Sequence, residues 1–153
     1  MSSIHTCHTF SFDSLTQTPI PLAQFAGKPL LVANIASRCG FHQQLNAFQQ
    51  LHTRGAQILL TPCNDFGKQE PLDTSALACH LGERYQLDCP VTSRVGIKYH
   101  PHPFYQWLGH QLPWYAYPRW NYYKFIFNAQ GQLIKWYAPW VSPLHQSITQ
   151  KLL

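Results

Sequence analysis

One stretch of the chain, residues 29–41, decides the fold; it reads PLLVANIASRCGF. Residues 29–36 are apolar except for Asn34, and they form a run of strand length without polar alternation. Such a run is typical of a strand that is covered on both faces in a parallel or mixed sheet. The run stops at the turn-like segment Ser37-Arg38-Cys39-Gly40. The stretch therefore predicts a buried central strand whose carboxyl end leads into a turn that carries a cysteine.

The residues after this turn predict a helix and a second buried strand. Apolar side chains recur beyond Gly40 at spacings of four, three and three residues, which places them on one stripe of a helix that ends near Gly55. These side chains are Phe41, Leu45, Phe48 and Leu51. Residues 57–63 form the next apolar run. A strand, a helix and a strand in this order indicate a parallel pair with a right-handed connection.

The other elements are expected on either side of this unit. Residues 10–21 predict a short amino-terminal hairpin. Further along we expect a helix from Thr74 or Ser75 to about Tyr85, a strand over 90–95, a helix over 103–112, strands over 121–127 and 133–137, and a closing helix from Ser142-Pro143 to Leu153. The prediction is one domain over residues 1–153, an α/β fold with a mixed central β-sheet flanked by helices and an amino-terminal β-hairpin.

The composition excludes several classes of protein. Of the 153 residues, 45% are hydrophobic and only 11% are charged, so the chain can bury a core. Its longest nearly apolar stretch, residues 29–33, is far shorter than the roughly 18 residues of a membrane span. The first ten residues hold no Lys or Arg and no apolar signal segment, so we expect a cytoplasmic protein without stable membrane insertion. Five cysteines, an odd number, favour free or redox-active thiols over a disulfide framework.

Cys39 lies where reactive groups gather in open α/β sheets, at the carboxyl end of a buried strand. We expect it in the first turn of the following helix, where backbone N–H groups and the helix dipole favour a thiolate, and Arg38 adds a positive charge. The pKa of Cys39 should therefore fall below the ordinary value of about 8.5. The alternative for an isolated cysteine is a small buried apolar side chain. The position beside Arg38 and Gly40 favours the reactive thiol.

Four blocks of sequence extend this site along nearly the whole chain. They are residues 27–41, residues 62–71 (PCNDFGKQEP), residues 120–125 (WNYYKF), and residues 137–139 followed by Ser142-Pro143. In their order and spacing the blocks resemble the glutathione peroxidase family, in which a cysteine or selenocysteine stands at the position of Cys39. The resemblance implies a thioredoxin-like fold. It also implies the reduction of hydrogen peroxide and of organic or lipid hydroperoxides to water or an alcohol, in the response to oxidative stress.

The resemblance further implies a catalytic group of Cys39, Gln69, Trp120 and Asn121. Taken singly, the last three have ordinary structural explanations as a loop amide, a core aromatic and a turn residue. Together they supply amide and indole hydrogens, which can stabilise a thiolate and a leaving oxygen without ionising. Oxidation of Cys39 would give a sulfenic acid that a second thiol converts to a disulfide. No cofactor or metal is implied, and the reductant, thioredoxin or glutathione, acts as a co-substrate.

The second thiol is less well defined by the resemblance. Family members that use a second cysteine place it on the helix after the Gln-Glu-Pro block, where ungapped counting gives Leu81. Cys79 lies two residues away, about 200 degrees around a helix, and would need local unwinding to pair with Cys39. Cys89 is the second candidate, and a chain without an internal partner is the third possibility. Cys63, at the end of a buried strand, is expected to pack in the core.

The short segment between Leu112 and Arg119 favours a monomer with an open site, because it lacks the long insertion that family members use for subunit contacts. Family members with this compact form and a cysteine in place of selenocysteine commonly draw electrons from thioredoxin rather than glutathione, so the resemblance implies a thiol peroxidase with thioredoxin as the preferred reductant. The alternative is a peroxide-sensing redox relay of the same fold, which would oxidise Cys39 rapidly but turn over poorly.

Two other functions are disfavoured. Residues 114–123 are rich in aromatic side chains, but only Arg119 and Lys124 interleave with them, so core packing is preferred to nucleic-acid binding. A metal site would have to use scattered ligands, because the sequence holds no metal-binding motif with the usual spacing. The scattered candidates are His5, Cys7, His8, His100 and His102.

Overall fold

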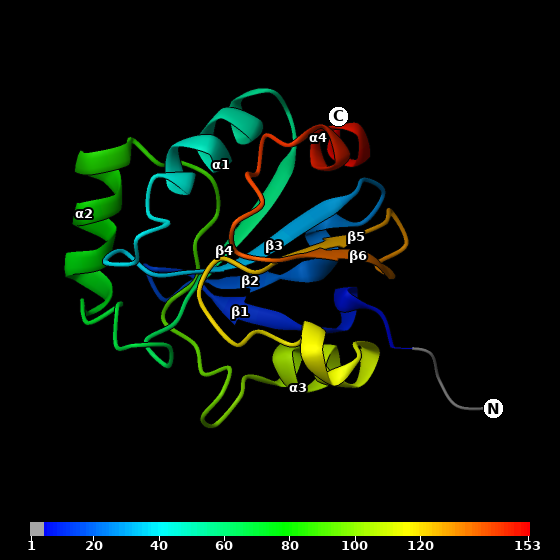
Figure 1. Cartoon of the computed structure of the whole chain (residues 1–153), viewed down its shortest axis with the longest axis horizontal. Helices are drawn as coiled ribbons and strands as arrows, with labels where there is room; N and C mark the ends of the chain where they lie inside the picture. The colour runs from blue at the N-terminus through cyan, green and yellow to red at the C-terminus, as the bar shows by residue number, and fades with distance from the viewer. Residues whose placement is uncertain (1–4) are drawn as a thin grey trace.

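The computed structural model describes residues 5–153, which fold around a four-stranded sheet (Figure 1). The strands lie in the order β4 (Gln57–Pro62), β3 (Leu30–Ile35), β5 (Lys124–Phe127) and β6 (Leu133–Tyr137). β3 runs parallel to β4 and antiparallel to β5, and β5 runs antiparallel to β6. The predicted mixed sheet, with its parallel pair, is confirmed.

β3 is buried along its whole length because both faces of the sheet are covered. Leu31, Ala33 and Ile35 point into one apolar cluster, whereas Leu30 and Val32 point into another. Alternate side chains of the strand thus enter opposite cores. This arrangement explains why residues 29–36 show so little polar alternation.

Helices cover both faces of the sheet. They are α1 (Gln44–Thr53), α2 (Thr74–Tyr85), α3 (Pro103–Gln111) and α4 (Gln146–Leu152). Buried residues of α1, α2 and α4 belong to the first cluster and those of α3 to the second, and Figure 1 shows α1 and α4 on one side of the sheet and α3 on the other. The buried residues of α1 are Leu45, Phe48 and Leu51, as their spacing predicts.

The predicted amino-terminal hairpin is present. Its strands β1 (Ser11–Asp13) and β2 (Pro19–Pro21) pair antiparallel in a separate two-stranded sheet. Phe12 and Ile20 point from it into the second cluster, together with α3. Three short 3-10 helices complete the described elements: η1 (Cys7–Thr9), η2 (Leu22–Phe25) and η3 (Trp114–Ala116).

Two helices begin later than the sequence predicts. The helix expected directly after Gly40 begins at Gln44, because His42 N donates to Cys39 O (3.0 Å) and the chain first forms tight turns. The start expected at Ser142-Pro143 is also wrong: α4 begins at Gln146. Ser142 Oγ accepts from Leu144 N in a local turn, and the Nδ1 atom of His145 caps the helix by accepting from Ser147 N (3.1 Å).

The cap of α2 also differs from the prediction of Thr74 or Ser75. Asp73 is the capping residue, and its Oδ1 accepts a hydrogen bond from Ala76 N at 2.8 Å. A carboxylate at this place satisfies one of the free N–H groups and interacts favourably with the helix dipole. Asp73 therefore caps the helix in place of Thr74 or Ser75.

Two predicted strands are shorter in the structure. The strand over residues 121–127 begins only at Lys124, because Tyr122 has a φ of 70° and leaves the extended region. The strand over residues 90–95 is reduced to two isolated bridges, Leu60 with Val91 and Ser14 with Thr92. The first correction shifts the start of a strand and the second removes a strand, but neither changes the order of the four strands in the sheet.

Candidate active site

Cys39 lies in the turn between β3 and α1, and it is only 2% exposed. The expected place in the first turn of a helix is therefore wrong, because α1 starts five residues later. The dipole of a helix acts mainly within its first turn. The burial of Cys39 also differs from the open site that the short segment before Arg119 suggests.

Gln69 and Asn121 are brought together from distant parts of the chain. Asn121 Nδ2 donates to Gln69 Oε1 at 3.1 Å and to Phe66 O at 3.3 Å. Asn121 is fully buried, and its Oδ1 atom has no partner among the described residues. Both Nδ2 hydrogens are thus committed to the loop that follows β4. The amide of Asn121 holds Gln69 in place, which differs from the donation to sulfur or leaving oxygen that the sequence suggests.

Trp120 packs against the same loop. A Cβ atom added to Gly67 would lie 2.7 Å from Trp120 Cη2, so the indole rests directly on this glycine. The carbonyl of Trp120 accepts from Asn34 Nδ2 at 2.9 Å, which ties the residue to β3. The Nε1 atom of Trp120 and the Nε2 atom of Gln69 donate no hydrogen bond to any described residue. Both side chains are partly exposed.

Hydrogen bonds connect the Cys39 turn to the Gln69 loop. Arg38 N donates to Gln69 O at 2.9 Å. Ser37 donates twice to the carboxylate of Glu70, from N to Oε1 (3.1 Å) and from Oγ to Oε2 (2.5 Å). Trp120 packs against the apolar cluster that contains Cys39. The four residues predicted for the site therefore lie on segments that are joined by hydrogen bonds or packing.

Glu70 is a member of this site that the sequence does not single out. It is fully buried, and desolvation raises its pKa, although the hydrogen bonds from Ser37 and the charges of Arg94 and Arg38 act in the opposite direction. A buried carboxylate is costly unless hydrogen bonds or charges stabilise it. The one signal in the sequence is that Glu70 belongs to a chain with only six acidic residues and follows Gln69 directly.

Tyr122 is a second buried residue beside the turn. Its hydroxyl donates to Ala36 O at 2.8 Å, and its backbone N donates to Asn34 O. Burial, with a smaller contribution from Cys39, raises the pKa of Tyr122 well above its ordinary value, so the hydroxyl stays neutral. Tyr122 thereby fixes the end of β3 from which the Cys39 turn departs.

The remaining cysteines fall into two groups, and all five thiols are free. Cys79 is exposed on α2, where a hydrogen bond from its Sγ to Glu83 Oε1 (3.2 Å) raises its pKa, while Leu81 points into the core. Cys7, Cys63 and Cys89 are buried, and desolvation raises the pKa of each to about 12. Cys89 belongs to the same apolar cluster as Cys39, whereas Cys79 does not belong to it.

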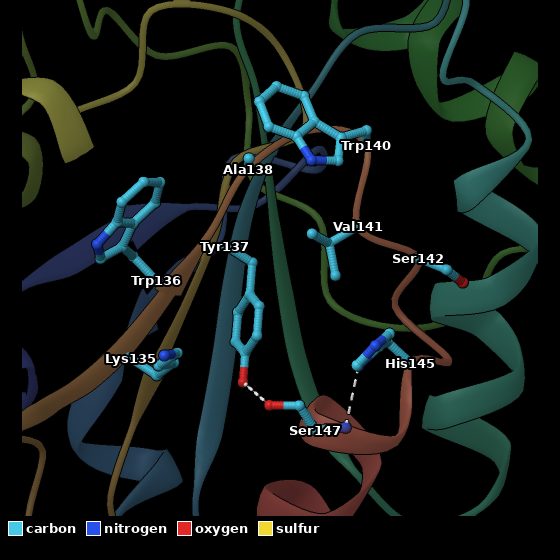
Figure 2. A pocket seen from close by; sticks show the side chains of 9 residues that line it. All are labelled: Lys135, Trp136, Tyr137, Ala138, Trp140, Val141, Ser142, His145 and Ser147. Carbon is cyan, nitrogen blue, oxygen red and sulfur yellow. Dashed lines mark hydrogen bonds between the residues drawn. The ribbon is translucent and has the colours of Figure 1, made fainter.

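Of the surface hollows, one lies at the Gln69 loop and another lies between two elements nearer the carboxyl terminus. One, of about 620 Å³, lies beside the Gln69 loop and is lined by Asn64, Asp65, Gly67, Lys68, Lys98 and Tyr99. The other, of about 520 Å³, lies between β6 and α4, where Tyr137 bonds to Ser147 and Trp140 is 75% exposed (Figure 2). Neither hollow is lined by Cys39. The first hollow lies closer to the predicted site, because two of its lining residues, Gly67 and Lys68, immediately precede Gln69 in the chain.

Asp65 shapes the wall of the first hollow. Its Oδ2 accepts from the backbone N atoms of Ile97 (2.8 Å), Lys98 (3.0 Å) and Tyr99 (3.1 Å). Burial acts to raise the pKa of Asp65, but these three hydrogen bonds outweigh it and hold the pKa below its ordinary value. The carboxylate therefore anchors the segment that carries Lys98 beside the Gln69 loop.

Residues 5–153 contain neither a membrane-spanning helix nor a cluster of metal ligands. Within this range no helix combines the length and the hydropathy that crossing a membrane requires. The same range holds no group of three or more His, Cys, Asp or Glu side chains suited to a metal ion.

Two solved structures illustrate the similarity in fold. The crystal structure of Trgpx in apo form matches with a TM-score of 0.75 and 25% identity, and covers 97% of this chain and 94% of that one. The thioredoxin family thiol:disulfide interchange protein of Chlorobium tepidum matches with a TM-score of 0.66 at 13% identity, covering 97% of each chain. The fold is therefore thioredoxin-like.

Sequence comparisons assign the family. The family model for glutathione peroxidase matches residues 7–109. The hydroperoxy fatty acid reductase gpx1 of Synechocystis sp. is 33% identical over 152 residues, covering 91% of this chain and 90% of that protein. The glutathione peroxidase-like peroxiredoxin gpx1 of Schizosaccharomyces pombe is 36% identical and covers 83% of this chain and 85% of its own. With the Cys39 turn at the carboxyl end of its central strand, this chain belongs to the glutathione peroxidase family, a family of peroxidases.

Proposed function

We propose that this chain reduces hydroperoxides with Cys39 as the peroxidatic thiol. The observation that carries the proposal is the hydrogen-bonded unit that joins the Cys39 turn to Gln69, and Gln69 to Asn121. The thiolate sulfur attacks the terminal oxygen of the hydroperoxide, an S–O bond forms, and the O–O bond breaks. The leaving oxygen takes a proton and departs as water or an alcohol, and Cys39 becomes a sulfenic acid.

Gln69 and Trp120 act as the donors in this step. The N–H groups at Gln69 Nε2 and Trp120 Nε1 donate no hydrogen bond to a described residue. Uncharged donors stabilise a developing negative charge without competing for the proton of the thiol. Asn121 supports the step indirectly, because it fixes Gln69 through the 3.1 Å hydrogen bond to Oε1.

A second thiol completes the cycle. It attacks the sulfur of the sulfenic acid, a disulfide forms, and the hydroxyl leaves as water; a dithiol or two thiol molecules then reduce the disulfide. We propose Cys79 as this thiol, because it is exposed and lies on the helix after the Gln69 loop. Cys89 shares the apolar cluster of Cys39, but its thiol is buried, with a pKa of about 12.

The resemblance to the glutathione peroxidase family also supports proposals for the reductant, the physiological role and the oligomeric state. We propose thioredoxin in preference to glutathione as the electron donor, a role in the response to oxidative stress, and a monomer of one domain that works in the cytoplasm. The short connection through η3 supports the monomer. Hydroperoxides of fatty acids or phospholipids are proposed as substrates beside hydrogen peroxide, since one relative is named a hydroperoxy fatty acid reductase.

A coupled assay tests the proposal. The parent and Cys39→Ser are given hydrogen peroxide and a lipid hydroperoxide, with thioredoxin or glutathione as reductant. We expect Cys39→Ser to lose more than about 3 kcal/mol of transition-state stabilisation, since a neutral hydroxyl is a far weaker nucleophile. Cys63→Ser is the matched control, because Cys63 is also buried and follows the neighbouring strand β4. Unchanged turnover in Cys39→Ser would end the proposal.

Mass spectrometry after one equivalent of peroxide identifies the second thiol. We expect a disulfide between Cys39 and Cys79 in the parent, and a persistent sulfenic acid in Cys79→Ser. Recovery of Cys39 only as a sulfenic acid or a mixed disulfide would exclude an internal partner. Fast oxidation of Cys39 with poor steady-state turnover would instead favour a peroxide-sensing relay.

A further inference from the structure

The Cys39 turn is closed in this structure. Cys39 is almost fully buried, whereas Cys79 is exposed and directs its Sγ toward Glu83. Leu81, which occupies the inward side of α2, is buried in the cluster of Cys39. A disulfide requires the two Cβ atoms to approach within roughly 3.5–4.5 Å. Neither Cys79 nor a thiol on another protein can meet the sulfur of Cys39 unless the turn opens.

One pair of side-chain contacts holds the turn against the neighbouring loop. Ser37, two residues before Cys39, donates to both carboxylate oxygens of Glu70, at 3.1 Å from its N and at 2.5 Å from its Oγ. Hydrogen bonds to a carboxylate are shorter and stronger than those between neutral groups. The adjacent contact, from Arg38 N to Gln69 O, uses backbone atoms alone. The Ser37–Glu70 contact joins a side chain of the turn to a side chain of the loop, whereas the Tyr122 hydroxyl holds only the carbonyl of Ala36, where the turn begins.

Glu70 is itself held on the other side. Its backbone N donates to Asn64 Oδ1 at 3.0 Å, and its carbonyl accepts from Arg94 Nη1 at 3.1 Å. The residue is fully buried beside Gln69. Glu70 thus belongs to the fixed wall of the site, and Ser37 belongs to the turn that has to move.

We propose, on the basis of the function assigned above, that Ser37 and Glu70 form a latch that sets the balance between two states of the Cys39 turn. In the closed state the latch positions Cys39 beside Gln69 for reaction with a hydroperoxide. In the open state Ser37 has left Glu70 and the Cys39 sulfur is accessible to a second thiol. Both residues are positioning residues, because they act through Cys39 and do not touch the reacting oxygen.

The latch predicts opposite changes in two rates. In Ser37→Ala the Oγ hydrogen bond is lost, so the closed state is less populated. We expect oxidation of Cys39 by hydrogen peroxide to slow by roughly tenfold, and alkylation of Cys39 by N-ethylmaleimide at the same pH to accelerate by a similar factor, as expected for the loss of one hydrogen bond to a charged group. Quenched samples analysed by peptide mass spectrometry give both rates.

Two variants make the test specific. Glu70→Gln keeps the shape of the side chain and an oxygen acceptor for Ser37 but removes the charge, and it should fall between the parent and Ser37→Ala in both rates. Ser142→Ala makes the same substitution in the loop before α4 and should leave both rates unchanged. If Ser37→Ala does not fold, Glu70→Gln decides the test alone.

The outcomes separate the latch from the peroxidase function. Oxidation and alkylation that change in the same direction, or that both stay within twofold of the parent, would overturn the latch. A parent whose Cys39 does not react with peroxide would overturn the proposed function. In that case a faster alkylation in Ser37→Ala still supports the latch, because alkylation needs no peroxide.

Discussion

Asn121 donates from Nδ2 to Gln69 Oε1 at 3.1 Å, although the two residues are 52 positions apart in the chain. This bond turns the amide of Gln69 so that its Nε2 hydrogens are free. The proposed donor, Gln69 Nε2, therefore depends on Asn121, whose own Nδ2 hydrogens are both engaged in hydrogen bonds.

Substitution of Asn121 by alanine tests this dependence. We expect Asn121→Ala to lower the rate constant for hydrogen peroxide by roughly five- to a hundredfold, which corresponds to the cost of about 1–3 kcal/mol for leaving a buried polar group without its partner. Stopped-flow measurement of single-turnover oxidation gives the rate. Asn128→Ala is the matched control, because Asn128 Nδ2 also donates to a glutamine oxygen, that of Gln132, in the exposed β5–β6 turn. An equal loss in both variants would contradict the role of Asn121.

A methyl group at Gly67 should disturb the indole of Trp120. The Cβ of Gly67→Ala would lie 2.7 Å from Trp120 Cη2, and Gly67 has a φ of 67°, which an alanine adopts only with strain. We expect a shift in tryptophan fluorescence, a loss of at least about 1 kcal/mol in the free energy of unfolding, and slower peroxide oxidation.

Gly82 provides the control for this substitution. It lies inside α2, and a Cβ added there meets nothing within 4 Å. Gly82→Ala should therefore raise the free energy of unfolding by roughly 0.5–1 kcal/mol through helix propensity, and leave the oxidation rate unchanged. A Gly67→Ala variant that behaves like Gly82→Ala would show that the contact with Trp120 is unimportant.

His102 should make the stability depend on acid pH. Its Nδ1 accepts from Phe104 N at 3.0 Å as the cap of α3, and its ring stacks on Phe12. Desolvation lowers the pKa of His102, although Ser11 and Asp13 act in the opposite direction. The unfolded chain thus binds a proton more readily than the folded one. The stabilising contribution is complete above the unfolded pKa of about 6.5 and is lost as the pH falls through the lower folded pKa.

Denaturant unfolding between pH 8 and pH 5 measures this effect. His102→Asn keeps a capping acceptor that does not titrate, so its free energy of unfolding should decline less than that of the parent over this range. Equal declines in the two proteins would assign the acid sensitivity to other groups.

Lys124 should produce a second dependence, at alkaline pH. It is fully buried, its Nζ donates to Pro139 O at 2.9 Å, and desolvation lowers its pKa to about 7. Between this value and the unfolded pKa of about 10.4 the unfolded chain binds more protons, so the free energy of unfolding should rise with pH. Lys124→Met should remove this rise and be more stable than the parent near pH 7, since Gln44 Nε2 still donates to Pro139 O.

The exposed Lys135 on the neighbouring strand is the control for this substitution. Lys135→Met makes the same substitution at an exposed position, and the rise in the free energy of unfolding between pH 7 and pH 10 should remain. A parent protein whose stability is flat between pH 7 and pH 10 would contradict the assignment to Lys124.

The sequence predicts the central strand because its physical cause is local. Leu30 and Val32 enter one core, and Leu31 and Ile35 enter the other. The unbroken apolar run therefore indicates that both faces of the strand are covered. The position of Cys39 at the end of this run follows directly. The boundaries of α1 and α4 are not predicted, because competing turn hydrogen bonds such as that from His42 N to Cys39 O decide them.

The contacts inside the site are beyond the reach of a single sequence for a different reason. Ser37 and Glu70 are 33 positions apart, and neither residue type at its place indicates the other. The burial of Cys39 likewise depends on an apolar cluster whose members, among them Leu81 and Tyr122, come from distant parts of the chain, which no local pattern encodes. Family resemblance identifies Gln69, Trp120 and Asn121, but it does not reveal that Asn121 has no free donor.

The pairing of β3 with β5 has a consequence for biosynthesis. Leu31 pairs with Ile126, so the strand before Cys39 gains its second neighbour only after most of the chain has left the ribosome. Until then the sulfur belongs to an incomplete core, and the Trp120 side chain that packs against this core is not yet in place. A nascent chain stalled before residue 120 therefore carries an unprotected thiol, which oxidants and disulfide exchange can modify before any enzyme exists.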